Sequence, residues 1–265
     1  MWTTLSLIAA LGLAPGQAGA LDLTNIRVTN GLLGTARGEA KLLPGDWYFV
    51  AFDIDNVKVN QAGEVLYSMA MELTDSKKKV LFKQDPRDLK VLNSLGGNRL
   101  PAFANVEIGI DQPPGQYTLT VTVVDRAAKA TKAFTREFEV VPPSFGLVRV
   151  NLSYDDRGNF PAPAVGVTGQ TFHVNFVAVG FKRGTNNDPN VAVEMNVVDD
   201  MGKPTLPKPL VGEVKELGKE HPVIPMQFYL ALNRAGKFTV KLKATDNISK
   251  KTAETSFPIT VLEMK

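Results

Sequence analysis

The 265-residue chain contains no cysteine and only two histidines. Without cysteine the protein has no disulfide, no thiolate nucleophile and no zinc site built on thiolates. His173 falls out of phase with the apolar residues around it, which predicts an outward or edge position, and His221 precedes a proline in a loop. The chain also lacks a serine in a nucleophile elbow and a glycine-rich phosphate loop after a strand. The sequence therefore predicts that the protein is not an enzyme.

A strong excess of charge of one sign is also missing. The net charge is only +3, the pI is near 8.9, and the clearest basic run is Lys77-Lys78-Lys79. Those lysines fall where a hairpin turn is expected, so they indicate a solvated turn. Because nucleic-acid binding needs a basic patch, we expect no nucleic-acid partner.

The chain has one long apolar run, residues 5–14, close to the N-terminus. Pro15 and Gly16 break it, and residues 18–20 supply the small side chains that a signal peptidase accepts. No Lys or Arg precedes the run, so a buried N-terminal strand or helix of a cytosolic protein is the alternative. We expect residues 1–20 to be a signal peptide, with no transmembrane segment in the mature chain and a periplasmic, cell-surface or secreted location.

A pattern of residues occurs twice in the chain, at a nearly constant offset. The matched positions are Gly45 and Gly169, Tyr48 and Phe172, Val50 and Val174, Met71 and Met195, Tyr117 and Phe238, and Asp125 and Asp246. A self-match at a fixed offset indicates two copies of one folding unit. Because the apolar residues alternate in each copy, that unit is built from strands.

The predicted fold class is all-β, with two tandem antiparallel sandwiches of the immunoglobulin-like kind. The first sandwich is expected over residues 21–141 and the second over residues 146–265. A Pro-rich hinge, residues 142–145, joins them and is stiff because Pro142 and Pro143 restrict the backbone.

Two segments are predicted to be irregular. Residues 83–99 are largely polar and are expected to form a long connection after a short strand at 80–82. Residues 204–210 are expected to form an edge strand interrupted by prolines.

Residues 111–125 read Asp-Gln-Pro-Pro-Gly-Gln-Tyr-Thr-Leu-Thr-Val-Thr-Val-Val-Asp. This segment resembles the E–F corner and F strand of bacterial immunoglobulin-like domains, and fibronectin III-like and cadherin-like sandwiches share its pattern. The resemblance places Tyr117 at the family's tyrosine corner, where the hydroxyl bonds to the backbone upstream, and Leu119 at the position of the second core cysteine. Phe238 takes the tyrosine position in the second copy, where only packing remains. Such a scaffold hosts many functions.

Four oxygen-bearing side chains are candidate calcium ligands. Asp53, Asp55 and Asn56 end one predicted strand, and Asp125 ends a neighbouring one. Hard oxygen ligands suit Ca²⁺, and cadherin-like modules bind it at domain junctions, so a calcium-stiffened adhesion module is one hypothesis. Asp and Asn also end strands for backbone reasons alone, in which case the protein has no cofactor.

Trp47 is the leading candidate for recognition. It precedes the core position Tyr48, so its side chain is expected on the outward face of the strand. An outward indole stacks on a sugar or docks a partner, which makes a carbohydrate-binding module a second hypothesis. The alternative is that Trp47 packs under an edge strand or under the loop of residues 32–43.

These observations predict an exported, non-catalytic binding or structural protein of the cell envelope. Its partner is expected to be a protein or polysaccharide of the envelope. Because the inner faces of both sandwiches hold the cores, recognition is expected to use edge strands and loops.

Overall fold

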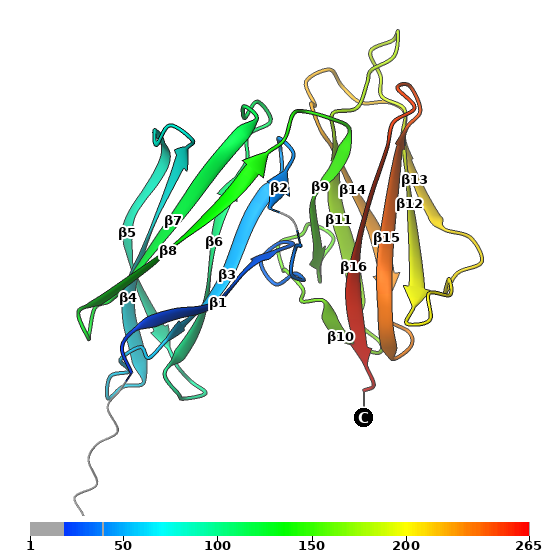
Figure 1. Cartoon of the computed structure of the whole chain (residues 1–265). Helices are drawn as coiled ribbons and strands as arrows, with labels where there is room; N and C mark the ends of the chain where they lie inside the picture. The colour runs from blue at the N-terminus through cyan, green and yellow to red at the C-terminus, as the bar shows by residue number, and fades with distance from the viewer. Residues whose placement is uncertain (1–18, 39, 265) are drawn as a thin grey trace, which may run out of the picture.

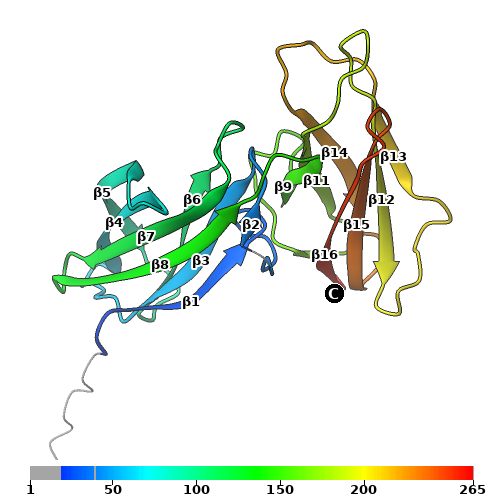
Figure 2. The ribbon, with the colours of Figure 1, turned by 45° about the horizontal axis from the view of Figure 1, so that its top comes forward.

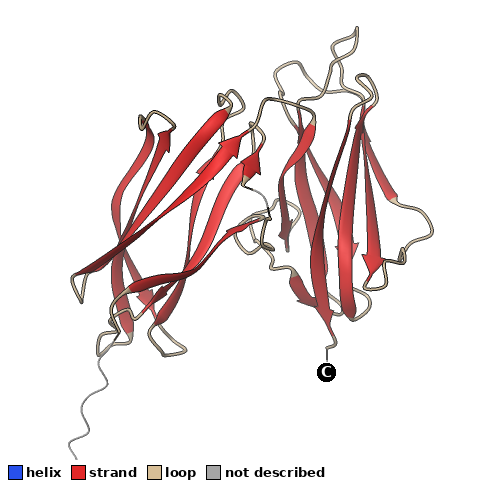
Figure 3. Ribbon diagram, viewed as in Figure 1, coloured by secondary structure: helices blue, strands red, loops and turns tan. Residues whose placement is uncertain are grey.

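The structure is a computed structural model that describes residues 19–38 and 40–264, so most of the expected signal peptide lies outside the described residues. The described residues form sixteen strands joined by turns and loops, without a helix (Figure 3). This confirms the predicted all-β class. Within the described ranges, no segment forms a helix that is long and apolar enough to cross a bilayer.

The first sandwich packs a three-stranded sheet, ordered β1-β3-β6, against a five-stranded sheet, ordered β2-β8-β7-β4-β5. Its strands are β1 (Asp22–Thr29), β2 (Lys41–Leu42), β3 (Trp47–Asp55), β4 (Glu64–Asp75), β5 (Val80–Leu92), β6 (Arg99–Glu107), β7 (Gly115–Asp125) and β8 (Ala130–Val140). All neighbours are antiparallel except β2 and β8.

The second sandwich repeats this plan with sheets ordered β14-β11-β9 and β10-β16-β15-β12-β13. Its strands are β9 (Gly146–Ser153), β10 (Val165–Val167), β11 (Thr171–Val179), β12 (Val191–Asp199), β13 (Leu210–Val214), β14 (Ile224–Ala231), β15 (Gly236–Asp246) and β16 (Thr252–Leu262). The single parallel pairing recurs here between β10 and β16.

The two sandwiches stand side by side, with the three-stranded sheet of each on the side of the junction (Figures 1 and 2). The outward faces of the two three-stranded sheets therefore look toward one another. Residues on β3, β6, β9, β11 and β14 accordingly line a shared cavity.

Alternation along the strands builds two separate cores. In β3 the side chains of Tyr48, Val50 and Phe52 are buried, and Phe172 and Val174 are buried at the matching positions of β11. One cluster of buried residues draws on positions 21–140 and the other on positions 145–261. Each sandwich thus has its own hydrophobic interior, as the period-two pattern indicates.

One of the two segments predicted to be irregular is wrong. Residues 83–92 are not a connection but belong to β5, which pairs with β4 along its length around two register shifts. Most of β5 is exposed. Leu89 and Val91, near its end, alternate with polar residues and pack partly buried against the first core, but residues 83–88 show no apolar alternation. Residues 204–210 lie along the edge of β12 in an interrupted way: Pro204 bridges Val198, the Thr205 N–H donates to Val197 O, and regular pairing resumes only with β13 at Leu210.

Candidate functional site

Arg149 joins the two sandwiches. Its backbone N–H donates to Asp46 Oδ1 at 2.9 Å, and its guanidinium Nε donates to Gly45 O at 2.6 Å. The guanidinium carbon also lies 5.0 Å from the ring centroid of Trp47, and one terminal nitrogen lies 3.3 Å from Glu107 Oε1. One residue of the second sandwich therefore makes four polar or cation–π contacts with the first.

The backbone at Arg149 adopts a conformation that is uncommon for a side-chain-bearing residue. Its φ is +54°, in the left-handed region, where β9 and β11 shift register. A bulge of this kind re-aims the side chain of the bulged strand. The local strain is offset by the contacts that it allows with the first sandwich.

The receiving side of this contact is held in place within the first sandwich. Asp46 is only 2% exposed, and its second carboxylate oxygen pairs with Arg37 at 2.8 Å. Gly45 has φ +93°, and a Cβ there would lie 3.2 Å from Ile110 and 3.4 Å from Val179 of the second sandwich. Glycine is therefore favoured at this position both by its backbone and by the close approach of the two units.

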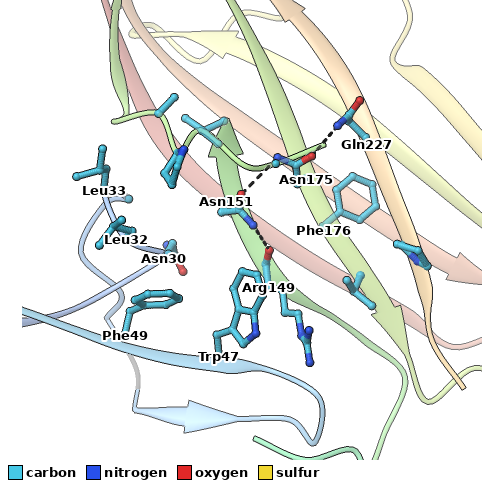
Figure 4. A pocket seen from close by; sticks show the side chains of 18 of the residues that line it. Asn30, Leu32, Leu33, Trp47, Phe49, Arg149, Asn151, Asn175, Phe176 and Gln227 are labelled. Atoms are coloured by element: carbon cyan, nitrogen blue, oxygen red, sulfur yellow. Dashed lines mark hydrogen bonds between the residues drawn. The ribbon is translucent and has the colours of Figure 1, made fainter. Parts of the chain in front are cut away.

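A row of hydrogen-bonded side chains runs across the outward face of the second sandwich toward Arg149 (Figure 4). Gln227 Nε2 donates to Asn175 Oδ1 at 2.7 Å, and Asn175 Nδ2 donates to Asn151 Oδ1 at 3.3 Å. Asn151 Nδ2 in turn donates to Arg149 O at 2.8 Å, while His173 Nδ1 contacts Gln227 Oε1 at 3.1 Å. The row fixes the amide orientations on this wall and supports the bulge that carries Arg149.

A cavity of 660 Å³ lies between the sandwiches, beside the Arg149 contact. We call it the junction cleft. Its residues come from the outward faces of β3, β6, β9, β11 and β14 and from the loops near positions 30–34 and 156–162. A volume of this size lies in the range of small-molecule sites, roughly 300–1,000 Å³.

The wall of the cleft on the first sandwich is apolar. Phe49 and Phe103 sit on neighbouring strands with ring centroids 6.4 Å apart and a tilt of 41°. Phe103 is 42% exposed, and Leu32 and Leu33 extend the same wall from the loop after β1 (Figure 4). Apolar residues also line the facing wall, among them Val177, Pro225 and Met226.

Three polar residues at the cleft have side chains that make no hydrogen bond or ion pair with the described residues. Asn105, Asp156 and Arg157 are exposed and take part in no side-chain hydrogen bond or ion pair within residues 19–38 and 40–264. They provide an amide, a carboxylate and a guanidinium toward solvent. These groups are available to a ligand without breaking an existing contact.

The structure places Trp47 at the edge of this cleft, half-buried, where its indole N–H donates to Glu107 Oε1 at 2.9 Å. Arg149 covers one face of the ring, and Phe49 meets it edge-on with centroids 5.9 Å apart. Trp47 is thus on the outward face of its strand, and it packs against the other sandwich rather than standing free in solvent.

The four candidate calcium ligands are each held by protein donors. Asp55 pairs with Arg99 at 2.6 Å; the hydrogen bond from Arg99, then that from Thr24, lowers the pKa of Asp55. Asp53 accepts from Asn25 Nδ2, and Asn56 Oδ1 accepts from Asn98 Nδ2. Asp125 is fully buried and accepts the backbone N–H groups of Lys58, Ala127 and Ala128. Among the described residues, no three His, Cys, Asp or Glu side chains gather as a metal site would require.

The corner residue Tyr117 makes the bond that the resemblance implies. Its hydroxyl donates to Pro113 O at 2.6 Å and accepts from Gln112 Nε2 at 2.8 Å. Phe238, its counterpart, is buried under the guanidinium of Arg234, whose carbon lies 5.2 Å from the ring centroid. Both residues are structural and lie away from the junction cleft.

A second cavity, of 680 Å³, opens between β12, β14 and the segment that precedes β13. The cavity lies beside the gap in the edge between Thr205, whose N–H donates to Val197 O, and the start of β13 at Leu210. Core residues such as Leu232 and Phe238 form its floor. Its lining also contains polar residues, among them Asp199, Lys203, Asn233 and Arg234.

Sequence reasoning missed Arg149, Asn151, Asn175 and Gln227. One signal was present: Trp47 and Phe49 are two apart on one strand, so both aromatics occupy the outward face. Two large aromatics on a face expected to meet water indicate a covered or binding surface. The partner residues carry no such signal, because they come from a distant part of the chain.

No protein-family model matches this chain, and no curated protein matches it. Among solved structures, it is similar to the transglutaminase of red sea bream, with 8% identity and a TM-score of 0.29 over 94% of this chain and 32% of that chain. It is also similar to an alkylpurine DNA glycosylase of Pseudomonas fluorescens bound to DNA containing an abasic site analogue. There the identity is 16% and the TM-score 0.30, over 47% of this chain and 31% of that chain. At these TM-scores neither likeness carries a functional argument, so the function is argued from the site.

Proposed function

We propose that this chain is an exported, non-catalytic binding protein of the cell envelope, and that it recognises its partner at the junction cleft. The observation that carries the proposal is the cleft itself, a cavity whose two walls come from different sandwiches and are held together by Arg149. A site whose walls are fixed before binding loses less conformational entropy on binding.

Immunoglobulin-like identity of the two sandwiches is part of the proposal. It is supported by the tandem repeat of one strand plan and by the bond from the Tyr117 hydroxyl to Pro113 O. Tandem sandwiches of this kind present surfaces at their junctions and loops. The loop of residues 30–34, which lines the cleft, fits that role.

A non-catalytic role is supported by the chemistry of the cleft. Its described side chains are mainly aromatic, aliphatic and amide groups, with one carboxylate and two guanidiniums. The nearby imidazole of His173 is engaged by Gln227 and by the ring of Tyr229. General acid–base or nucleophilic catalysis needs converging groups, such as a nucleophile beside a base, and the lining provides no such pair.

Recognition through edge strands is less well supported than recognition at the cleft. The long edge strand β5 carries Pro86 and a register shift beside it, together with alternating Lys, Asp and Arg side chains. These features are typical of edges that avoid pairing with another chain.

Export with cleavage after residue 20 is compatible with the first core. Leu21, the expected first residue of the mature protein, is 6% exposed and belongs to the first core. Purification from the envelope fraction of the source organism, followed by mass spectrometry of the N-terminal peptide, tests this point. A mature chain that retains residues 1–20 would contradict export by cleavage.

Co-sedimentation with the insoluble envelope fraction tests the binding role. We expect the wild-type protein to sediment with it and Asn105→Trp, which fills the cleft from an exposed position, to remain in solution. Phe82→Trp is the matched control, because Phe82 is 45% exposed on β5, outside the cleft. Equal sedimentation of both variants would move recognition elsewhere, and no sedimentation of the wild type would end the binding proposal.

A further inference from the structure

Two phenylalanine rings on the apolar wall of the junction cleft have faces on which a sugar ring can pack. Phe49 and Phe103 form a tilted pair on adjacent strands, and neither ring face is covered by a cation as that of Trp47 is. The C–H face of a pyranose packs on aromatic rings, because both surfaces are apolar while the hydroxyl groups point sideways. The aromatic platform is therefore Phe49 and Phe103, and Trp47 acts in the contact between the sandwiches.

The polar groups around this platform suit hydroxyls, which both donate and accept. Asn151 uses one N–H for Arg149 O and keeps a second one, while the amide of Asn105 keeps its full capacity. Asp156 adds a strong acceptor and Arg157 a strong donor at the rim. Asn105 lies on β6 with Phe103, whereas Asn151, Asp156 and Arg157 come from the second sandwich, so both walls of the cleft provide polar groups.

The charge of the lining excludes a strongly anionic polymer. Its charged side chains are Arg149, Asp156 and Arg157, and Arg149 is already paired with Glu107. The charges of the Asp156 carboxylate and the Arg157 guanidinium cancel. A nucleic acid or a sulfated polymer would need several uncompensated cations.

The backbone of the walls disfavours a peptide that pairs as an added strand. β3 and β11, the central strands of their sheets, are hydrogen-bonded on both sides and present only side chains to the cleft. A peptide recognised by strand addition needs an unpaired edge. The other wall strands, β6, β9 and β14, are the edges of their sheets, and the residues that they contribute to the cleft include Phe103, Asn151 and Gln227.

We propose that the junction cleft binds a segment of a neutral polysaccharide, with one sugar ring packed on Phe49 and Phe103 and its hydroxyls on the amides of Asn105 and Asn151. This inference rests on the proposed function that the cleft is the recognition site. It specifies the ligand class, and it assigns the stacking of the sugar to Phe49 and Phe103 rather than to Trp47.

Native affinity electrophoresis of the full chain tests the proposal. The gels contain hydroxyethylcellulose, xylan, galactomannan or laminarin as neutral probes, and heparin as the anionic probe. We expect at least one neutral glycan to retard the wild-type protein, and Phe103→Ala and Asn105→Ala each to raise the apparent Kd about tenfold or more. The matched controls Phe82→Ala and Tyr229→Ala, one on β5 and one at the second cavity, should migrate like the wild type.

Circular dichroism confirms that each variant is folded before it is scored. Retardation that persists in Phe103→Ala and Asn105→Ala, or that disappears in Tyr229→Ala alone, would place glycan binding outside the cleft and overturn the proposal. Retardation by heparin alone would overturn it in favour of an anionic ligand. Sedimentation with the envelope fraction, without retardation by any neutral glycan, would overturn the proposal that the ligand is a glycan. It would leave the binding role intact. Sedimentation abolished by protease treatment of the envelope would identify a protein partner instead.

Discussion

The guanidinium of Arg149 lies over the indole ring of Trp47, 5.0 Å from its centroid, and the same arginine donates its backbone N–H to Asp46, 103 positions away in the chain. Trp47 and Asp46 are consecutive, so a single turn before β3 receives both contacts. This pair determines how the two sandwiches meet and where the cleft between them lies.

Arg149→Ala should loosen the junction while leaving both cores folded. The variant loses the cation–π contact, the bond to Gly45 O and the Glu107 pair, for an expected cost of about 1–3 kcal/mol. Small-angle scattering should show a broader distribution of distances than for the wild type. Arg136→Ala is the control, since Arg136 also lies over a phenylalanine but within the first sandwich. An unchanged scattering curve for Arg149→Ala would show that Arg149 does not hold the two sandwiches together.

Tyr48→Phe should stabilise the first sandwich. The Tyr48 hydroxyl is buried without a hydrogen-bond partner among the described residues, and burial raises the pKa of the phenol. The matching residue of the second sandwich is already Phe172, which is equally buried. Removing the unpaired hydroxyl should raise the free energy of unfolding by about 1 kcal/mol, measured by urea denaturation. A loss of stability would reveal a partner for this hydroxyl.

Tyr117→Phe also removes one phenol oxygen, but it should destabilise the first sandwich. Its hydroxyl donates to Pro113 O, so its loss leaves a backbone carbonyl and the Gln112 amide without that partner. We expect a loss of about 1 kcal/mol in the same urea experiment. Equal stability of Tyr117→Phe and the wild type would show that the corner bond contributes nothing.

Asp246→Asn should weaken the second sandwich in a pH-dependent way. Burial alone would raise the pKa of Asp246, but the hydrogen bonds from Ser249 and from the backbone of Lys182, Ile248 and Ser249 together lower it. A pKa that is lower in the folded state stabilises the fold above the unfolded value of about 3.9, and this contribution is lost as pH falls through the folded value.

The variant should therefore lose about 2 kcal/mol near neutral pH, and its difference from the wild type should shrink below about pH 4. Thermal melts across this range provide the measurement, with Glu254→Gln, an exposed pair with Lys243, as the control. A difference that stays constant into acid would show that the ionised carboxylate is not the stabilising form.

Removal of calcium should leave the melting temperature unchanged. Asp53 and Asp55 already face protein donors, and Asp125 is enclosed by backbone N–H groups, so a cation would have to displace them. Melts with added Ca²⁺ and with EDTA check this. A higher melting temperature in Ca²⁺ that Asp55→Asn removes would restore the calcium-stiffened adhesion hypothesis.

Much of the scaffold was predictable because it depends on local periodicity. Alternation placed Tyr48 and Phe172 inside and Trp47 outside, and the repeat predicted two sandwiches before any contact was known. The turn at residues 77–79 followed from polar residues between strands, and Asp75 indeed caps it by accepting from the backbone N–H groups of Lys77 and Lys79.

The edge strand β5 was not predictable in the same way. An edge strand that is mostly exposed has few buried positions to select apolar residues, so residues 83–88 look like a loop, and only Leu89 and Val91 alternate and pack against the core. Only pairing with β4, visible in the structure, distinguishes the two.

The sequence by itself determined two copies of an alternating, all-strand unit, because burial of every second side chain constrains residue types along each strand. The tertiary structure alone decided the site. Arg149 meets Gly45, Asp46 and Trp47 through a left-handed backbone bulge, and Asn151, Asn175 and Gln227 align only when three strands lie side by side. Contacts between residues so far apart in the chain depend on how the two sandwiches dock, and no local pattern of residues records that geometry.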